Sequence, residues 1–100
     1  MKITFEKKDN AITVIIAGRL DTSTSVQAEK EFQTLYNTEA EEIIFDCSEL
    51  EYVSSSGLRL FLSVLKLSRS EGKHVFFSKM NDYLKEVFTM TCFTSLFEFK

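Results

Sequence analysis

The first twenty residues show two strand patterns joined by a polar turn. Ile3 and Phe5 alternate with polar neighbours, which predicts a strand with one buried face. Residues 7–10, Lys-Lys-Asp-Asn, suit a tight turn because Asp and Asn tolerate turn conformations. Residues 11–17 are almost continuously apolar, which is typical of a strand covered on both faces. We therefore expect a β-hairpin whose second strand ends at Gly18.

A first helix is expected after this hairpin. Residues 22–25 are all Ser or Thr, which are common at helix N-termini, and Thr24 with Gln27 matches the spacing of a capping box. Apolar residues then fall on one helical face, and they are Ala28, Phe32, Leu35 and Tyr36. This pattern predicts a helix that packs one face against the sheet.

The middle of the chain predicts a strand, a loop and a longer helix. Residues 43–45 are a short apolar run that follows a polar connector, and we interpret them as a buried strand. Residues 49–53 are expected to form a short loop. Residues 54–57 are Ser-Ser-Ser-Gly, and a helix is predicted from about residue 56 to residue 69, closed by residues 71–72.

This longer helix has two apolar faces. One arc holds Leu58, Phe61, Leu62 and Leu65. Nearly opposite lie Leu60, Val64 and Leu67, because each residue adds about 100° around the axis. The polar face holds Arg59, Ser63, Lys66 and Ser70. A helix of this kind has two surfaces to bury.

The last quarter predicts a strand, a short helix and an edge strand. Residues 74–77 read as a third buried strand, and Asn81 or Asp82 is placed to cap the helix. The apolar residues at helical spacing in that helix are Leu84, Val87 and Phe88. Residues 96–99 alternate once more. The order β-β-α-β-α-β-α-β requires crossover connections, so we expect an α/β fold with a mixed, mostly parallel sheet and helices packed against it.

Composition is consistent with one domain spanning residues 1–100. The chain is 44% hydrophobic and 27% charged, which argues against disorder. No apolar run approaches the ~20 residues of a membrane-spanning helix, and the N-terminal residues do not resemble a secretory signal. The net charge of −3 disfavours nucleic acid or an anionic membrane surface as the main partner. We expect a cytoplasmic protein.

Cysteine and histidine usage restricts the chemistry further. Cys47 and Cys92 lie among apolar neighbours and form no Cys-x-x-Cys pair, so we interpret them as reduced buried thiols, with a disulfide or a reactive thiol as the alternative. His74 has no nearby His or Cys to complete a metal site, and the sequence has no Gly-x-Ser-x-Gly elbow. We expect no metal, no cofactor and no catalytic activity.

The serine run at residues 54–56 places hydroxyls at the start of the longer helix. A helix N-terminus has unsatisfied N–H groups and the positive end of the helix dipole, so it accepts anions. A phosphoryl group there would add a charge of about −1.5 to −2. The alternative is that the serines are only N-caps, each worth about 1 kcal/mol to the helix. The spacing alone leaves both interpretations open.

Three segments carry a resemblance to a known family. Residues 18–21, Gly-Arg-Leu-Asp, match a Gly-x-Leu-Asp motif after the second strand, and residues 46–48, Asp-Cys-Ser, match an Asp-Leu-Ser turn. Residues 52–58, Tyr-Val-Ser-Ser-Ser-Gly-Leu, match a phosphorylation loop of the form aromatic-apolar-Asp-Ser-Ser-Gly-Leu. With the element order, which agrees over nearly the whole chain, the sequence resembles the STAS domain, in particular the free-standing bacterial anti-sigma factor antagonists.

The resemblance implies a partner switch. In such systems the unmodified antagonist binds an anti-sigma factor that is also a serine kinase, which releases the sigma factor. The kinase phosphorylates the loop serine and the complex separates, and a PP2C-type phosphatase restores binding. For the oligomeric state, the sequence leaves a monomer and a weak dimer as alternatives.

The resemblance also assigns residues. The acceptor is Ser55, with Ser54 and Ser56 as less favoured positions, and Gly57 would let the backbone turn tightly into the helix. The implied partner-binding surface is Asp21, Ser54, Ser56, Gly57, Arg59, Leu60 and Ser63. The chain departs from the family at Ser54, where an acid is common, and at residues 91–93, Thr-Cys-Phe, where the family has Thr-Gly-Leu.

The same resemblance orients the longer helix. The arc that contains Leu58 and Phe61 is expected to face the sheet. The opposite arc is expected to pack, in at least one residue, against the last helix, or to stay exposed for docking. Two other functions remain open: a STAS scaffold subunit of a transporter or signalling assembly that is not phosphorylated, and an enzyme with a Ser55 nucleophile, for which no base is evident.

Overall fold

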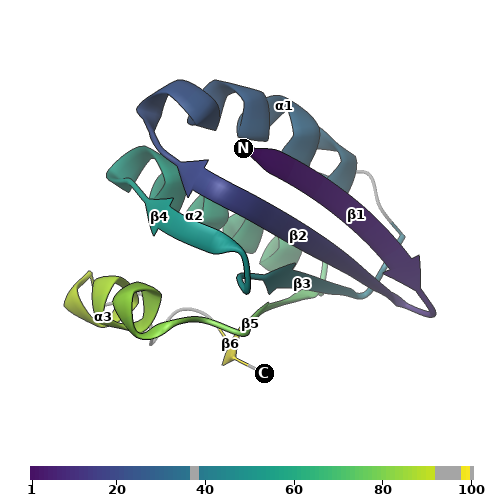
Figure 1. The fold of residues 1–100 in the computed structure, drawn as a ribbon. Helices are drawn as coiled ribbons and strands as arrows, with labels where there is room; N and C mark the ends of the chain where they lie inside the picture. Colours follow the sequence, from purple (N-terminus) through teal and green to yellow (C-terminus); the bar gives the residue numbers. More distant parts are fainter. Residues whose placement is uncertain (37–38, 92–97, 100) are drawn as a thin grey trace.

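The structure is a computed structural model that describes residues 1–36, 39–91 and 98–99. Its strands are β1 (Lys2–Lys8), β2 (Ala11–Leu20), β3 (Glu42–Asp46), β4 (Leu50–Val53), β5 (His74–Ser78) and β6 (Glu98–Phe99). Its helices are α1 (Thr22–Tyr36), α2 (Ser55–Ser70) and α3 (Asp82–Met90), and Figure 1 shows their arrangement. The predicted order is confirmed, with one added strand, β4. The predicted strand at residues 96–99 is confirmed for β6, and residues 96–97 lie outside the described residues.

The described strands form one mixed sheet in the order β1-β2-β3-β5-β6. β1 and β2 form the expected antiparallel hairpin, and the pairs β2–β3, β3–β5 and β5–β6 are parallel. Crossover helices make these parallel pairs possible. The predicted α/β fold with a mostly parallel sheet is therefore confirmed.

The prediction of a loop at residues 49–53 is wrong, because residues 50–53 form strand β4. β2 is ten residues long and β3 only five, so β3 covers only the first half of the β2 edge. β4 pairs in parallel with the second half, where a bulge follows Gly18. Gly18 has φ +101°, a conformation that favours glycine, and its N–H donates to the Glu49 carbonyl at 2.9 Å.

The helices in the described part of the chain cover one face of the sheet, not both as the apolar run of β2 suggested. α1 and α2 lie side by side on that face, and α3 lies beyond the end of β5 (Figure 1). Val14 and Phe45 point into this layer and are fully buried. On the other face Ile15 and Ile44 are only half-buried. Strand residues alternate between faces, so an unbroken apolar run can still have one partly solvated side.

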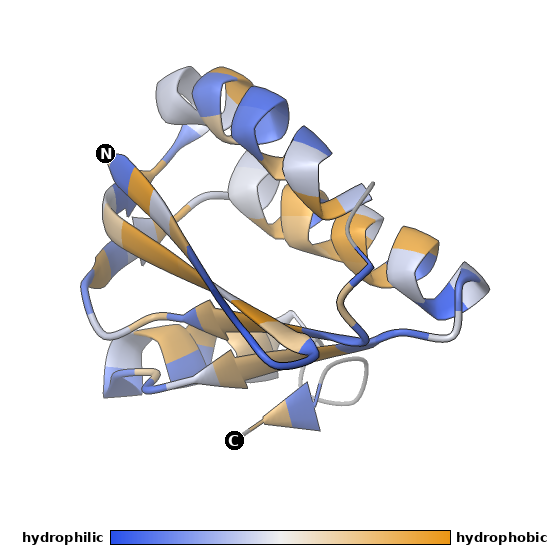
Figure 2. Ribbon diagram, turned by 90° about the vertical axis from the view of Figure 1, so that its right-hand side faces the viewer, coloured by the Kyte–Doolittle hydropathy of each residue, from blue (hydrophilic) through white to orange (hydrophobic). Residues whose placement is uncertain are grey.

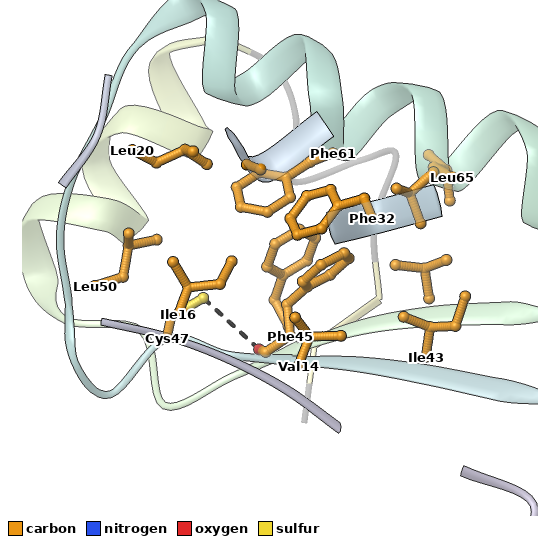
Figure 3. Close-up of a cluster of buried hydrophobic side chains, with 14 of the residues drawn as sticks. Val14, Ile16, Leu20, Phe32, Ile43, Phe45, Cys47, Leu50, Phe61 and Leu65 are labelled. Atoms are coloured by element: carbon orange, nitrogen blue, oxygen red, sulfur yellow. Dashed lines mark hydrogen bonds between the residues drawn. The ribbon is translucent and has the colours of Figure 1, made fainter. Parts of the chain in front are cut away.

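A cluster of phenylalanines fills the space between the helices and the sheet (Figure 3). Its members are Phe32, Phe45, Phe61, Phe77 and Phe88, and each is at most 1% exposed. The ring centroids of Phe45 and Phe61 are 4.9 Å apart, and those of Phe77 and Phe88 are 5.0 Å apart. Edge-to-face pairs of this kind add about 0.5–1.5 kcal/mol each beyond their burial. α1, α2, α3 and the central strands are therefore joined by one core.

The two apolar faces of α2 are both used, but not as expected. Leu58, Phe61 and Leu65 are buried toward the sheet as predicted, while Leu62 is half-buried. From the opposite arc Val64 is fully buried, Leu60 is half-buried and Leu67 is 41% exposed. The helix beside α2 is α1 and not the last helix (Figure 2), because the crossovers from β2 and β4 carry α1 and α2 over neighbouring strands.

Candidate functional site

Ser54 is the N-cap of α2. Its backbone is extended, and its Oγ accepts a hydrogen bond from the Gly57 N–H at 3.2 Å. Its own N–H donates to the Leu20 carbonyl at 2.8 Å, which ties the start of α2 to the end of β2. The helix therefore begins at Ser55, one residue before the predicted start.

Ser55 and Ser56 have hydroxyls that the cap does not use. Ser55 is the first helical residue and is exposed, and Ser56 is half-buried. Within the ranges that the structure describes, neither hydroxyl makes a hydrogen bond. Capping thus accounts for Ser54 and leaves Ser55 open to solvent at the positive end of the helix dipole.

Gly57 has a packing role, which corrects the expectation of a tight turn. It lies within the first turn of α2 and is buried. A Cβ on Gly57 would lie 2.8 Å from Leu20 Cγ and 2.9 Å from Val53 Cγ2, closer than carbon atoms approach. The absence of a side chain therefore lets α2 start directly against β2 and β4.

Asp21 caps α1, so the predicted capping box of Thr24 and Gln27 is wrong. The Asp21 carboxylate accepts from the N–H groups of Ser23 at 3.1 Å and Thr24 at 3.0 Å. In return Thr24 Oγ1 accepts from the Asp21 N–H at 2.9 Å. Asp21 and Thr24 thus make the reciprocal hydrogen bonds of a capping box, one turn earlier along the chain than the predicted pair. The hydroxyl of Ser23 and the Thr24 N–H lower the pKa of Asp21 to about 2, so its carboxylate is ionised at neutral pH.

The hydrogen bond between Ser54 and Leu20 brings the two helix starts together. Asp21 follows Leu20 directly, and Ser55 follows Ser54. α1 and α2 therefore begin beside each other at the carboxyl ends of β2 and β4 (Figure 1). Of the residues predicted to form the partner surface, the structure brings Asp21, Ser54 and Gly57 close together.

Further along α2 lie the other predicted contacts. Arg59 and Ser63 are exposed and Leu60 is half-buried. The Ser63 hydroxyl donates to the Arg59 carbonyl at 3.0 Å, so its proton is already used within the helix. These residues extend from the helix start along α2, and they share the surface that Ser55 begins.

An aromatic stack on β2, β4 and α3 was not predicted from the sequence. The Arg19 guanidinium lies 4.3 Å above the centre of the Tyr52 ring, and the Tyr52 and Tyr83 ring centroids are 6.3 Å apart. Arg19 and Tyr52 are paired residues of β2 and β4, while Tyr83 comes from α3 and is 40% exposed. The only sequence signal was the position of Tyr52 in the loop motif, because these contacts join three distant segments.

Asp46 is the last residue of β3, and Cys47 follows it directly. Burial raises the pKa of Asp46, but the Ser48 N–H at 2.9 Å and Lys79 at 3.6 Å outweigh burial and lower it overall. Cys47 is 1% exposed and free, which confirms a reduced buried thiol there. Burial first, and the charge of Asp46 second, raise the pKa of Cys47 to about 12. Cys92 lies outside the described residues.

His74 lies far from the serines along the sheet. It begins β5 and is paired with Glu42, at the amino ends of the parallel strands, and its Nδ1 lies 3.3 Å from Glu98 Oε2. Ser55 follows the carboxyl end of β4. Among the described residues, no cluster of three His, Cys, Asp or Glu side chains could hold a metal ion. Nor is any helix in those ranges both long and apolar enough to cross a bilayer.

Comparisons with known proteins point to one domain family. The model of the STAS domain family matches residues 2–100. BtrV of Bordetella bronchiseptica, named as a candidate anti-sigma factor antagonist, is 28% identical over 97 residues, which cover 97% of this chain and 84% of BtrV.

Solved structures share the fold at low sequence identity. A candidate anti-sigma factor antagonist from Thermotoga maritima is similar with a TM-score of 0.89 and 17% identity, covering 97% of this chain and 84% of that one. The Bacillus cell fate determinant SpoIIAA in its phosphorylated form is similar with a TM-score of 0.75 and 17% identity, covering 99% and 91%.

Proposed function

The chain belongs to the STAS domain family, and on that premise we propose that it is an anti-sigma factor antagonist switched by phosphorylation of Ser55. The relatives named anti-sigma factor antagonists support the general function. The observation that carries the site is the contrast between two neighbouring serines. Ser54 is bound to the Gly57 N–H, whereas the Ser55 hydroxyl is exposed and makes no hydrogen bond in the described part of the chain.

In the unmodified state, the surface around the two helix starts binds an anti-sigma factor that is also a serine kinase, and this binding releases the sigma factor in the cytoplasm. The contacts on this chain are Asp21, Ser54, Ser56, Gly57, Arg59, Leu60 and Ser63. Gly57 contributes by allowing α2 to start close to β2, which fixes the position of Ser55 relative to Asp21. The chain itself supplies a hydroxyl and a surface, and the kinase supplies the chemistry.

The switch is a transfer of the γ-phosphoryl group of ATP to Ser55 Oγ, with the hydroxyl proton lost to the kinase base and ADP as the other product. The phosphate adds a charge of about −1.5 to −2 at pH 7. The start of α2 tolerates that charge because its N–H groups and dipole favour anions, so the fold is preserved. The partner meets new charge and bulk at the centre of its contact surface, and it dissociates. A PP2C-type phosphatase hydrolyses the ester and restores the hydroxyl.

Mass spectrometry of the protein purified from its own host tests the acceptor directly. We expect a single phosphate on Ser55. In binding assays with the cognate kinase, Ser55→Ala should bind and not be released by ATP, whereas Ser55→Asp should bind at least tenfold more weakly.

Two neighbours serve as controls. Ser54→Ala removes the cap, worth about 1 kcal/mol, but keeps the acceptor, so it should still be phosphorylated. Ser56→Ala also keeps the acceptor and should still be phosphorylated. Full phosphorylation of Ser55→Ala would contradict the assignment of the acceptor. Absence of phosphate from the wild type with the kinase present would contradict the switch and favour a scaffold role.

A further inference from the structure

Strand β1 forms a long free edge of the sheet. It spans Lys2–Lys8 and is paired with β2 alone, and in the described part of the chain the opposite edge is β6, which has only two residues. No described element packs against the outer side of β1 (Figure 1). Such an edge presents a row of unpaired N–H and C=O groups to any strand that can align with it.

The side chains of β1 alternate in a way that the β2 register defines. Ile3 and Phe5 are paired with buried Ile16 and Val14, so they lie on the helix-covered face, where both are half-buried. Lys2, Thr4 and Glu6 lie on the other face and are exposed. The helix-covered face of the edge therefore carries Ile3 and Phe5, with Lys7 near its end, and the other face is polar and charged.

This pattern is complementary to itself. We place a second copy of β1 antiparallel to the first, with Thr4 opposite Thr4. Two residues from different copies then lie opposite each other when their numbers add to eight. Lys2 then lies opposite Glu6, and Glu6 opposite Lys2. Ile3 lies opposite Phe5 on the helix-covered face. Opposite charges and apolar residues placed directly across from each other stabilise antiparallel pairs, while like charges destabilise them.

Neighbouring registers lack this match. The registers that keep the helices of both copies on the same face differ by two residues, because side chains alternate with a period of two. Such a shift moves the centre of the pair by one residue, to Phe5 or to Ile3. A pair centred on Phe5 places Lys2 opposite Lys8 and Ile3 opposite Lys7. A pair centred on Ile3 places Lys2 opposite Thr4 and Phe5 opposite Met1, so the Lys2–Glu6 and Ile3–Phe5 pairs are lost. Of these three registers, only the one centred on Thr4 places Lys2 opposite Glu6 and Ile3 opposite Phe5.

From this register we propose that β1 is the interface of a symmetric homodimer, in which two sheets join antiparallel across Thr4. The two-fold axis runs through the Thr4–Thr4 pair, normal to the sheet, and the helical layers of both copies lie on one face. The inference does not rest on the proposed function, since β1 carries none of the residues assigned to the switch. Ser55→Asp should therefore leave the dimer unchanged.

A charge-swap cycle tests the register by sedimentation equilibrium over a concentration series. Lys2→Glu places a carboxylate opposite that of Glu6 in the other copy, and Glu6→Lys places an ammonium opposite that of Lys2. Each single change alters two symmetric pairs and should weaken association by about tenfold. The double change Lys2→Glu with Glu6→Lys should restore it. Lys8→Glu is the matched control, because it changes net charge by the same amount as Lys2→Glu but lies beyond the paired residues.

Cross-linking tests the position of the axis. Thr4→Cys should form a disulfide-linked dimer under mild oxidation much faster than Lys8→Cys, because only the first pairs with itself across the axis. Circular dichroism confirms that each variant is folded. A chain that stays monomeric at 1 mM, single changes that weaken association no more than Lys8→Glu, or equal cross-linking of the two cysteine variants would each overturn the proposal. Capture of another protein's strand by monomeric β1 would do the same.

Discussion

At the scale of single residues, hydrogen bonding separates side chains that look alike in the sequence. Ser54 and Ser55 are neighbours of the same type, but one caps α2 and the other is exposed. The sequence predicted a serine-capped helix but not which serine, because a shift of one residue in the helix start exchanges their roles. Asp21 and Thr24 show the same limit, since either residue could have started a capping box and the backbone position decides between them.

The cap at Asp21 predicts a pH dependence. Hydrogen bonds from Ser23 and Thr24 lower the folded-state pKa of Asp21 from its ordinary 3.8 to about 2. A lowered folded-state pKa means that ionised Asp21 stabilises the fold fully above the unfolded pKa, and that this contribution is lost as the pH falls from about 4 toward 2. Asp21→Asn keeps an oxygen acceptor without the titration. Urea unfolding should therefore show the wild type more stable than Asp21→Asn at pH 6, with the difference shrinking toward pH 2.

Taking the difference between the two proteins removes the titration of the other carboxylates, which both share. A difference that stays constant from pH 6 to pH 2 would show that the carboxylate charge is not what caps α1.

At the scale of elements, close approach of α2 to the sheet positions Ser55, the proposed phosphorylation site. β4, the bulge at Gly18 and the missing side chain of Gly57 together allow α2 to start against Leu20. Helices and long strands were predictable because their apolar residues repeat over many positions. β4 was not, because it has four residues and exists only by pairing with the distant end of β2.

Gly57→Ala should destabilise the protein although alanine is the better helix former. The new methyl group would lie 2.8 Å from Leu20 Cγ, and Leu20 is fully buried and cannot move freely. We expect a loss of about 1–3 kcal/mol in the free energy of unfolding, measured in urea.

Leu20→Ala provides the matched background, because it removes Leu20 Cγ and Cδ2, two of the three atoms that the methyl group would meet, and leaves Val53 Cγ2. In that background the loss from Gly57→Ala should be clearly smaller. A stabilising Gly57→Ala in the wild type would mean that helix propensity outweighs the contact.

At the scale of the whole molecule, the fold class was predictable and the covering of the sheet was not. The order of strands and helices required parallel pairs and crossovers, and both were found. The apolar residues Ile15 and Ile44 made the strands look buried on both faces, whereas the described helices pack from one side. Hydropathy alone does not distinguish an apolar residue that faces the core from one on a partly solvated face.

Cys47 reports on opening of the whole core. It follows β3 and is 1% exposed, and burial raises its pKa to about 12, so alkylation requires unfolding around it. With iodoacetamide at pH 8, labelling of the peptide that contains Cys47 should be at least about a thousandfold slower in the native protein than in urea, because open states are rare.

Peptide mapping by mass spectrometry separates this signal from that of Cys92. Equal labelling rates in buffer and in urea would show that the thiol is accessible without unfolding, contrary to the structure.

The one-sided covering of the sheet also bears on how freely the sequence can vary. Positions such as Thr13, Ile15 and Ile44 lie outside the packed core, so replacements there need only suit a strand. Their neighbours Val14 and Phe45 have no such freedom, because any change of volume disturbs the phenylalanine cluster. Every second residue of the central strands is thus open to mutational drift, and new recognition surfaces can arise there while the position of Ser55 is kept.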